Sequence, residues 1–242
     1  MTVLITGGTG RLGRHVVDAL RSRKADLRIL SRRPGDDHVV GDLSTGAGLA
    51  AALDGIDTVV HLATSRSKDV GQTRRLLDAM AGSGAHLLFI SIVGVDRIPY
   101  GYYRDKVASE KLIEASGLPF TIIRVTQFHG FVHEVLEAQR RLPVTFVLPV
   151  SAQTIHMPEV AERLADLVAA GPSGRVPDLG GPEQLTLREY ARQWQAARAV
   201  HRPIWALHLP GKAIAAFTAG HHMSGLPGAG KVTYREYLER GE

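Results

Sequence analysis

The chain has 242 residues, of which 44% are hydrophobic, and it carries a formal net charge of +5. This length suits one large domain, or one domain with a small appendage. Cysteine is absent, which excludes disulfides and thiolate metal sites and fits a reducing cytosol. No uninterrupted apolar run approaches the roughly 18 residues of a membrane span, and the first residues read as a strand rather than a signal peptide. We therefore expect a cytoplasmic protein without a membrane span.

The charged residues are dispersed along the chain. Lysine and arginine total 29 against 24 acidic residues, but no block of about five or six like charges stands out. Nucleic-acid binding uses a basic patch or stripe, so we expect no nucleic-acid partner. The 11 histidines have no carboxylate or histidine partner at ligand spacing, so we expect no metal site.

The first half of the chain alternates short β-branched runs with amphipathic segments. Strands are expected at residues 2–6, 27–31, 57–63, 86–91 and 120–125, with a shorter one at 38–40. Helices are expected between them, at about 11–24, 47–54, 69–83 and 102–117. This alternation predicts an α/β fold of the Rossmann-like kind, a doubly wound parallel sheet with right-handed crossovers.

The pattern loosens after about residue 126. Two further helices are expected, at 158–171 and 185–200, and the second opens with Thr186 as a plausible N-cap and Glu189 three residues later. No internal repeat or linker separates this half from the first. We therefore expect a nucleotide-binding core over residues 1–131 and a small substrate-capping elaboration of the same domain over 132–242.

A glycine turn follows the first expected strand. Gly7, Gly10 and Gly13 lie three apart, directly before a helix. In a dinucleotide-binding turn the first glycine permits the tight turn, the second lets the pyrophosphate approach the backbone, and the third lets the helix pack closely. The positive end of that helix then faces the phosphates. The turn predicts an NAD(P) site, which Thr9, Arg11 and Leu12 complete; the alternative is an ordinary strand-to-helix turn.

The end of the second strand bears on the choice of cofactor. An acidic residue there would bind the ribose hydroxyls of NAD, whereas arginine accommodates the extra phosphate of NADP. Arg32 and Arg33 occupy this place, and Asp36 and Asp37 come only after a Pro-Gly turn. We therefore expect NADP(H) to be favoured over NAD(H); the alternative is two arginines solvated in a surface loop.

Several motifs together resemble a known family. The chain is similar to the short-chain dehydrogenase/reductase superfamily, and most of all to its atypical branch of NmrA-like and nucleoside-diphosphate-sugar-epimerase-like proteins. The stretches that carry the resemblance are TGGTGRLG (6–13), GDL (41–43), ALDGIDTVVHLAT (52–64), FISIVG (89–94) and the segment 102–131. The resemblance implies that Asp42 and Leu43 lie near the adenine, and that Ala63 and Thr64 line the ribose side of the cofactor.

The superfamily's reductases share a Ser, Tyr and Lys arrangement that Ser91, Tyr102 and Lys106 resemble. A hydride that arrives at a carbonyl or imine carbon leaves negative charge on the heteroatom, which needs a proton. Tyr102 would supply it, Lys106 would favour the phenolate and grip the nicotinamide ribose, and Ser91 would bond the oxyanion. The neighbouring Tyr103 is an alternative to Tyr102, and the whole stretch could instead be a surface turn that runs into a helix.

Substrate should lie at the carboxyl edge of the sheet. Candidate pocket residues follow the fifth and sixth strands, or lie in a segment that resembles one that crosses back over the cleft in similar proteins. They are Val93, Gln127, Phe128, His129, Phe131 and Gln153.

These features predict an NADPH-dependent reductase of a carbonyl, imine or conjugated double bond in a small, mostly apolar molecule. One alternative is a non-catalytic NADP(H)-binding redox sensor of the NmrA type, which loss of the Ser, Tyr and Lys set would favour. Another is a nucleotide-sugar epimerase or dehydratase, which would need a larger and more polar second half. Helices that flank such sheets often pair, so a homodimer is also expected.

Overall fold

The computed structural model describes residues 1–65, 67–225 and 228–241. The chain divides into two compact units whose segments alternate along it. Unit 1 comprises Met1–Ser91, Gly101–Arg124 and Val160–Pro177, and unit 2 comprises Ile92–Tyr100, Val125–Glu159 and Asp178–Glu242. The sequence suggested one boundary at residue 131, whereas the chain returns to unit 1 after residue 159 to add a helix and a short strand to the sheet.

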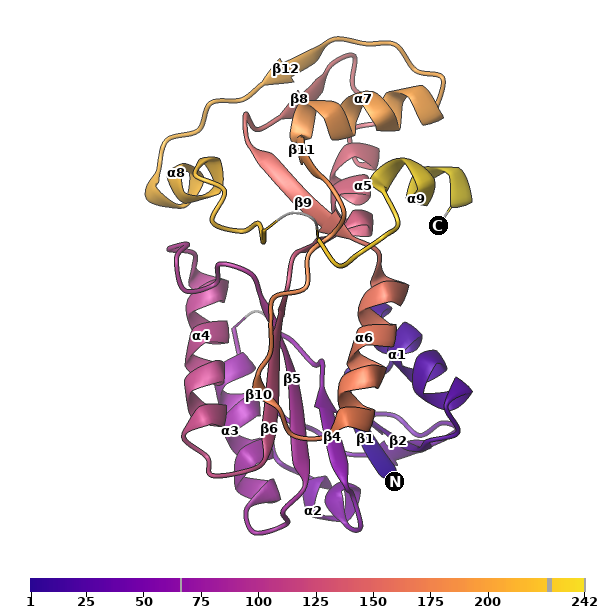
Figure 1. Cartoon of the computed structure of the whole chain (residues 1–242), viewed down its shortest axis with the longest axis vertical. Coiled ribbons are helices and arrows are strands. Elements are labelled where there is room, and N and C mark those ends of the chain that lie inside the picture. The colour runs from indigo at the N-terminus through magenta and orange to yellow at the C-terminus, as the bar shows by residue number, and fades with distance from the viewer. Residues whose placement is uncertain (66, 226–227, 242) are drawn as a thin grey trace. The chain divides into compact units, whose positions relative to one another are not determined.

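Unit 1 is built on a seven-stranded sheet with the order β10-β6-β5-β4-β1-β2-β3. Its strands are β1 (Thr2–Thr6), β2 (Asp26–Ser31), β3 (His38–Val40), β4 (Thr58–His61), β5 (His86–Ile92), β6 (Phe120–Val125) and β10 (Gly174–Arg175). Its helices are α1 (Arg11–Ser22), α2 (Leu49–Leu53), α3 (Asp69–Met80), α4 (Gly101–Glu114) and α6 (Met157–Ala170). Helices α3 and α4 lie on one face of the sheet, and α1 and α6 on the other (Figure 1). The predicted Rossmann-like, doubly wound α/β fold is confirmed.

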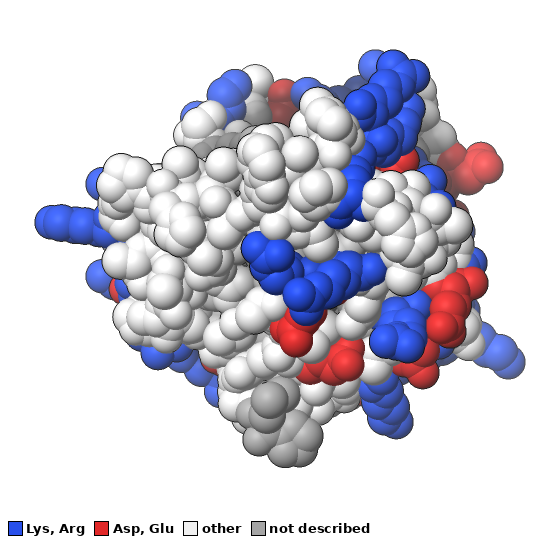
Figure 2. Space-filling view, turned by 90° about the horizontal axis from the view of Figure 1, so that it is seen from above, with Lys and Arg blue, Asp and Glu red and all other residues white. Residues whose placement is uncertain are grey.

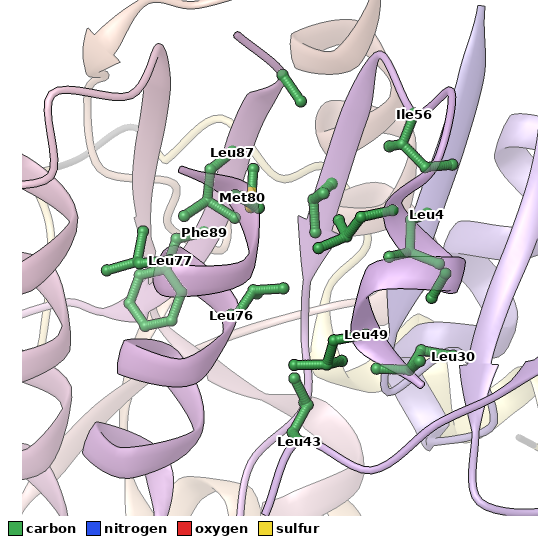
Figure 3. Packing of buried hydrophobic residues seen from close by; sticks show 14 of the residues in the cluster. Leu4, Leu30, Leu43, Leu49, Ile56, Leu76, Leu77, Met80, Leu87 and Phe89 are labelled. Atoms are coloured by element: carbon green, nitrogen blue, oxygen red, sulfur yellow. The ribbon is translucent and has the colours of Figure 1, made fainter. Parts of the chain in front are cut away.

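The strands of unit 1 are apolar on both faces because helices cover both. Val3, Leu4 and Ile5 of β1 are fully buried, as expected for a central parallel strand. On the face that carries α2 and α3, Leu4 belongs to a hydrophobic cluster that also includes Leu49 of α2 (Figure 3). This packing anchors the central strands, at whose carboxyl ends the candidate site lies.

The predicted element bounds hold within a few residues, and the early end of one helix has a local cause. The helix expected over 69–83 ends at Met80, and Ala81 leaves the helical conformation with ψ at 127°. Gly82 follows with φ at +77°, a left-handed value that favours glycine. Gly82 therefore stops the helix before the end of its amphipathic pattern.

Unit 2 contains short strands that the sequence did not predict. Its elements are β7 (Gln127–Phe128), α5 (His129–Glu137), β8 (Thr145–Val147), β9 (Ser151–Ile155), β11 (Gln184–Thr186), α7 (Leu187–Ala197), β12 (Ile204–Ala206), α8 (Lys212–Thr218) and α9 (Tyr234–Arg240). They form a three-stranded sheet, β11-β9-β7, and a pair, β12-β8. The predicted capping box of Thr186 and Glu189 is confirmed, and Thr233 with Glu236 begins α9 in the same way.

The described helices bear on the expectation that no segment spans a membrane, and the surface bears on the expectation that basic residues are dispersed. In the described part of the chain, none of the helices combines the length and the apolar character that crossing a membrane requires. On the face shown in Figure 2, lysine and arginine side chains are scattered, and several lie beside acidic ones.

Candidate active site

The glycine turn at the end of β1 is closely packed where the dinucleotide interpretation requires it. Gly7 has φ at +73°, and a Cβ there would lie 2.7 Å from the backbone nitrogen of Ala63. A Cβ on Gly13 would overlap the carbonyl oxygen of Gly7. Gly10, the N-cap of α1, is different, because a Cβ there would meet only Gly7 O, at 3.1 Å. The turn thus presents open backbone at the positive end of a helix, which fits the pyrophosphate of an NAD(P) cofactor.

Substitution of Gly13 tests how much this packing matters. We expect Gly13→Ala to lower the free energy of unfolding by about 2 kcal/mol, because the added Cβ meets the backbone of Gly7 and Gly8. Urea denaturation measures the change. The matched control is Gly71→Ala in α3, whose Cβ would meet only the flexible end of Arg75, at 3.3 Å. That variant should lose no stability, and equal stability of the two variants would contradict the argument.

The strand end next to the turn is basic. Arg32 and Arg33 are exposed directly after β2, and the backbone N–H of Arg33 donates to Ser31 Oγ. Asp37 pairs with Arg21 of α1 at 2.6 Å, so its carboxylate is already engaged. Thr9 and Arg11 of the turn are exposed and Leu12 is half-buried.

The residues that the resemblance assigns to the nucleotide differ in their accessibility. The side chain of Asp42 accepts a hydrogen bond from the backbone of Ser44 at 2.8 Å, and so shapes its own loop. Leu43 is buried in the core cluster, so only its backbone could reach a ligand. Ala63 is half-buried against the glycine turn, and Thr64 is exposed.

Tyr102 and Lys106 lie one turn apart on α4 and belong to one connected set. The hydroxyl of Tyr102 lies 3.1 Å from Thr64 Oγ1. Lys106, 4% exposed, has its Nζ 3.4 Å from the carbonyl oxygen of Ile90 and 3.8 Å from a carboxylate oxygen of Asp69. Asp69 in turn accepts a hydrogen bond from Thr64 Oγ1 at 2.7 Å. The sequence did not single out Asp69, because an acidic residue in the first turn of an expected helix signals the start of the helix and not a functional site.

The structure separates the two adjacent tyrosines. Tyr103 is 8% exposed and buried in unit 1, whereas Tyr102 is half-buried. Their ring centroids are 6.2 Å apart. The hydroxyl of Tyr102, with the correct spacing to Lys106, is thus the one that approaches Thr64.

The ammonium of Lys106 is held in a desolvated place. Burial lowers its pKa, and the charges of Asp69 and Glu110 oppose that effect. The ammonium also lies over the ring of Phe89, 4.7 Å from the centroid. Burial, together with the charge of Lys106, lowers the pKa of nearby His61 to about 3, so this imidazole is neutral at neutral pH.

Ser91 lies in a different environment from Tyr102. It is 3% exposed, and its Oγ has no hydrogen bond of normal geometry among the described residues, although it lies near enough to Glu110 to favour the charged carboxylate. Burial raises the pKa of Glu110, but hydrogen bonding from Arg124, Ser91 and Arg175 outweighs burial, so the pKa lies below its usual value. The oxyanion role of Ser91 stays a prediction, and its enclosure beside a carboxylate does not favour it.

The remaining candidates belong to unit 2. His129 is 2% exposed, with Nδ1 2.6 Å from Thr154 Oγ1 and Nε2 2.9 Å from the carbonyl oxygen of Val232. Both ring nitrogens therefore have protein partners. His129 could bind a ligand only if one of these contacts were broken.

Gln153 is likewise engaged inside unit 2. Its Nε2 donates to the carbonyl oxygen of Gly181, and its Oε1 accepts from the backbone of Ser224, both at 2.8 Å. The sequence reading missed the hollow that adjoins it, a cavity of about 480 Å³. The residues that line the cavity are Arg97, Asp178, Gly180, Met223, Ser224, Gly225, Gly228 and Ala229.

The other residues expected to contact substrate lie at different depths. Val93 is fully buried, and Phe131 is 49% exposed on α5. Gln127 and Phe128 are half-buried, and the Gln127 side chain accepts a hydrogen bond from the backbone of Phe128. Their contact with a substrate stays a prediction.

A family match and two similar proteins relate the chain to NAD(P)H-binding reductases. The family described as NAD(P)H-binding matches the chain over residues 7–169. The (4-alkanoyl-5-oxo-2,5-dihydrofuran-3-yl)methyl phosphate reductase of Streptomyces griseus is 29% identical over 215 residues, which cover 84% of this chain and 75% of that protein. Quinone oxidoreductase 2 of Escherichia coli is 24% identical over 212 residues, which cover 79% and 72%.

Two solved structures share the fold over nearly the whole chain. The NADPH-dependent quinone oxidoreductase of Escherichia coli, complexed with NADPH, has a TM-score of 0.84 at 19% identity and covers 98% of this chain and 99% of its own. The triphenylmethane reductase of Citrobacter sp., complexed with NADP(H), has a TM-score of 0.85 at 16% identity and covers all of both chains. At these identities the likeness establishes the fold.

Proposed function

Because the chain belongs to the NAD(P)H-binding family and is an oxidoreductase of the short-chain dehydrogenase/reductase type, we propose that it uses NADPH to reduce a small, mostly apolar molecule. The reacting group would be a carbonyl, an imine or a conjugated double bond. The observation that carries this proposal is the connected set in which Thr64 approaches the Tyr102 hydroxyl and Asp69 pairs with the buried Lys106.

Two residues of this set, Tyr102 and Lys106, have a direct role in the proposed reaction. When bound, the cofactor supplies the hydride. Tyr102 gives its hydroxyl proton to the heteroatom, or to the second carbon, of the reduced bond, and solvent returns a proton to the half-buried phenolate. The contacts of Lys106 at 3.4 and 3.8 Å are longer than strong charge-assisted hydrogen bonds, so its ammonium retains the capacity to donate to a ribose hydroxyl.

The relatives suggest which substrates to screen. Their names describe reduction of a quinone, a triphenylmethane compound and a dihydrofuran phosphate. Quinones, triphenylmethane dyes and unsaturated lactones are therefore the first acceptors to test for NADPH oxidation. A redox sensor of the NmrA type would bind NADPH and oxidise it with none of them.

The cofactor is tested by fluorescence titration with NADPH and NADH. We expect Arg32→Ala to raise the Kd for NADPH by about tenfold or more, towards the value for NADH, because a charge contact to the extra phosphate is worth at least about 1.4 kcal/mol. The Kd for NADH should change little. Arg188→Ala removes an equal charge from an exposed site in unit 2 and should leave both constants unchanged. An Arg32→Ala variant that still prefers NADPH as the wild type does would overturn the assignment of Arg32.

A further inference from the structure

Asp69 is a carboxylate in direct contact with Lys106, and the reaction described above does not use it. It begins α3 and is 4% exposed. One carboxylate oxygen accepts from the backbone N–H of Ser65 at 2.6 Å and faces the Ser65 hydroxyl at 3.3 Å. The other accepts from Thr64 Oγ1 at 2.7 Å and lies 3.8 Å from Lys106 Nζ. A buried carboxylate with this many hydrogen-bond donors is held in one orientation.

The hydrogen bonds have a direction. A threonine hydroxyl has a single proton to donate, and Thr64 gives its proton to Asp69. At the 3.1 Å contact between Thr64 and Tyr102, Tyr102 must therefore be the donor. The hydroxyl proton of Tyr102 thus points into a chain that ends on Asp69.

We propose that Asp69 is the positioning residue of this site: it holds the Tyr102 hydroxyl in place through Thr64 and holds the Lys106 ammonium through its own carboxylate. The proposal rests on the proposed function, because it assigns what prepares the proton donor and the ribose ligand. It also connects α3, α4 and the loop after β4, since Asp69, Lys106 and Thr64 come from these three segments.

The proton step balances within this chain of groups. The Tyr102 O–H first turns from Thr64 towards the substrate atom. Its O–H bond then breaks as the bond from the proton to that atom forms, and a phenolate remains. The Thr64 hydroxyl then turns from Asp69 to donate to the phenolate. Asp69 keeps its bond from the Ser65 backbone and its ion pair with Lys106, so its charge stays compensated. A proton from solvent restores Tyr102, and Thr64 turns back.

Among the described residues, the ionisable groups near the Lys106 ammonium include Tyr102, one turn before it on α4, together with Asp69 of α3, Glu110 of α4 and His61 of β4. The His61 imidazole is neutral. Burial lowers the pKa of Lys106, while Asp69 and Glu110 raise it. Removal of the Asp69 charge should lower that pKa further. The ammonium, and with it the contact to the ribose, would then be lost at a lower pH.

The first experiment measures the Kd for NADPH by fluorescence between about pH 6 and about pH 10. In Asp69→Asn the pH above which binding weakens should fall by about one unit or more relative to wild type. Asp78→Asn, an exposed substitution on the same helix, should follow the wild-type curve. Superimposable curves for wild type and Asp69→Asn would overturn the proposal and leave the reductase function standing. A wild type that binds neither nucleotide would instead remove the proposed function, and the role of Asp69 with it.

A second variant decides the question if Asp69→Asn does not fold. Thr64→Val removes the hydroxyl but keeps the side-chain shape and leaves the Asp69–Lys106 pair in place. We expect kcat, measured at saturating NADPH, to fall about tenfold or more. Thr64→Ser, which restores a hydroxyl, should recover most of the lost rate. A Thr64→Val variant with wild-type kcat would exclude the relay through Thr64, and equal losses in the serine and valine variants would do the same.

Discussion

Replacement of Tyr102 by phenylalanine is expected to lower kcat by about 10² to 10⁴-fold. The variant lacks the hydroxyl that lies 3.1 Å from Thr64 Oγ1, and so cannot deliver a proton to the reduced substrate. The Kd for NADPH should stay within about threefold of wild type, because this loss acts on the chemical step. Stopped-flow measurement of single-turnover NADPH oxidation, beside the fluorescence titration, separates the two effects.

The neighbouring tyrosine is the control for this prediction. Tyr103→Phe removes a hydroxyl from a side chain of the same helix that is buried in unit 1. Its kcat should stay within about threefold of wild type. If Tyr103→Phe loses the rate and Tyr102→Phe keeps it, the assignment of the proton donor is reversed. If both keep it, the proton comes from another group or from solvent.

The second large effect concerns stability. Glu110 is 1% exposed and accepts hydrogen bonds from Arg124 at 2.7 and 3.0 Å and from Arg175 at 2.9 Å. Removal of one partner from a buried charged cluster leaves the other charges uncompensated, which costs about 3 to 5 kcal/mol. We expect Glu110→Gln, measured by urea denaturation at about pH 7, to lower the free energy of unfolding by about 3 kcal/mol.

The pH dependence of this loss follows from the pKa of Glu110. Hydrogen bonding, chiefly from Arg124, holds that pKa below its usual value despite burial, so the unfolded chain takes up this proton first as the pH falls. The stabilisation by Glu110 is present above the unfolded pKa of about 4.3 and is lost as the pH falls through the folded value. The difference between wild type and Glu110→Gln should therefore shrink at about pH 3.

Glu114 provides a matched control for the Glu110 variant. It lies one turn further along α4 and pairs with the same Arg175 at 2.6 Å, but its side chain is 37% exposed. Glu114→Gln should cost less than about 1 kcal/mol, as exposed ion pairs do. Equal losses in the two glutamine variants would show that the enclosure of Glu110 adds nothing.

Local patterns in the sequence were sufficient for the architecture of unit 1. The strands at 2–6 and 120–125 were predicted to the residue, because strands buried on both faces are apolar throughout and end at polar or turn-forming residues. The resemblance to the short-chain dehydrogenase/reductase superfamily, the Rossmann-like fold and the oxidoreductase class are all confirmed. The placement of Tyr102 and Lys106 on one helix face was also predictable from local spacing, because one turn of helix brings both residues to one face.

The sequence could not predict contacts between segments that are far apart along the chain. Asp69 and Lys106 are 37 positions apart and meet only because α3 and α4 pack beside each other on one face of the sheet. Conversely, His129 and Gln153 had the residue types of ligand donors, but the fold of unit 2 engages them with Thr154, Val232 and Gly181.

What the sequence determined and what only the tertiary structure decided therefore differ for a physical reason. The sequence by itself determined the elements of unit 1, the glycine turn and the helical Tyr-Lys pair, because backbone conformation and helical periodicity depend on residues close together in the chain. Only the tertiary structure decided which of Tyr102 and Tyr103 meets Thr64, and that Ser91 lies enclosed beside Glu110. Those outcomes depend on burial and on partners from distant segments, which are set when the helices pack on the sheet.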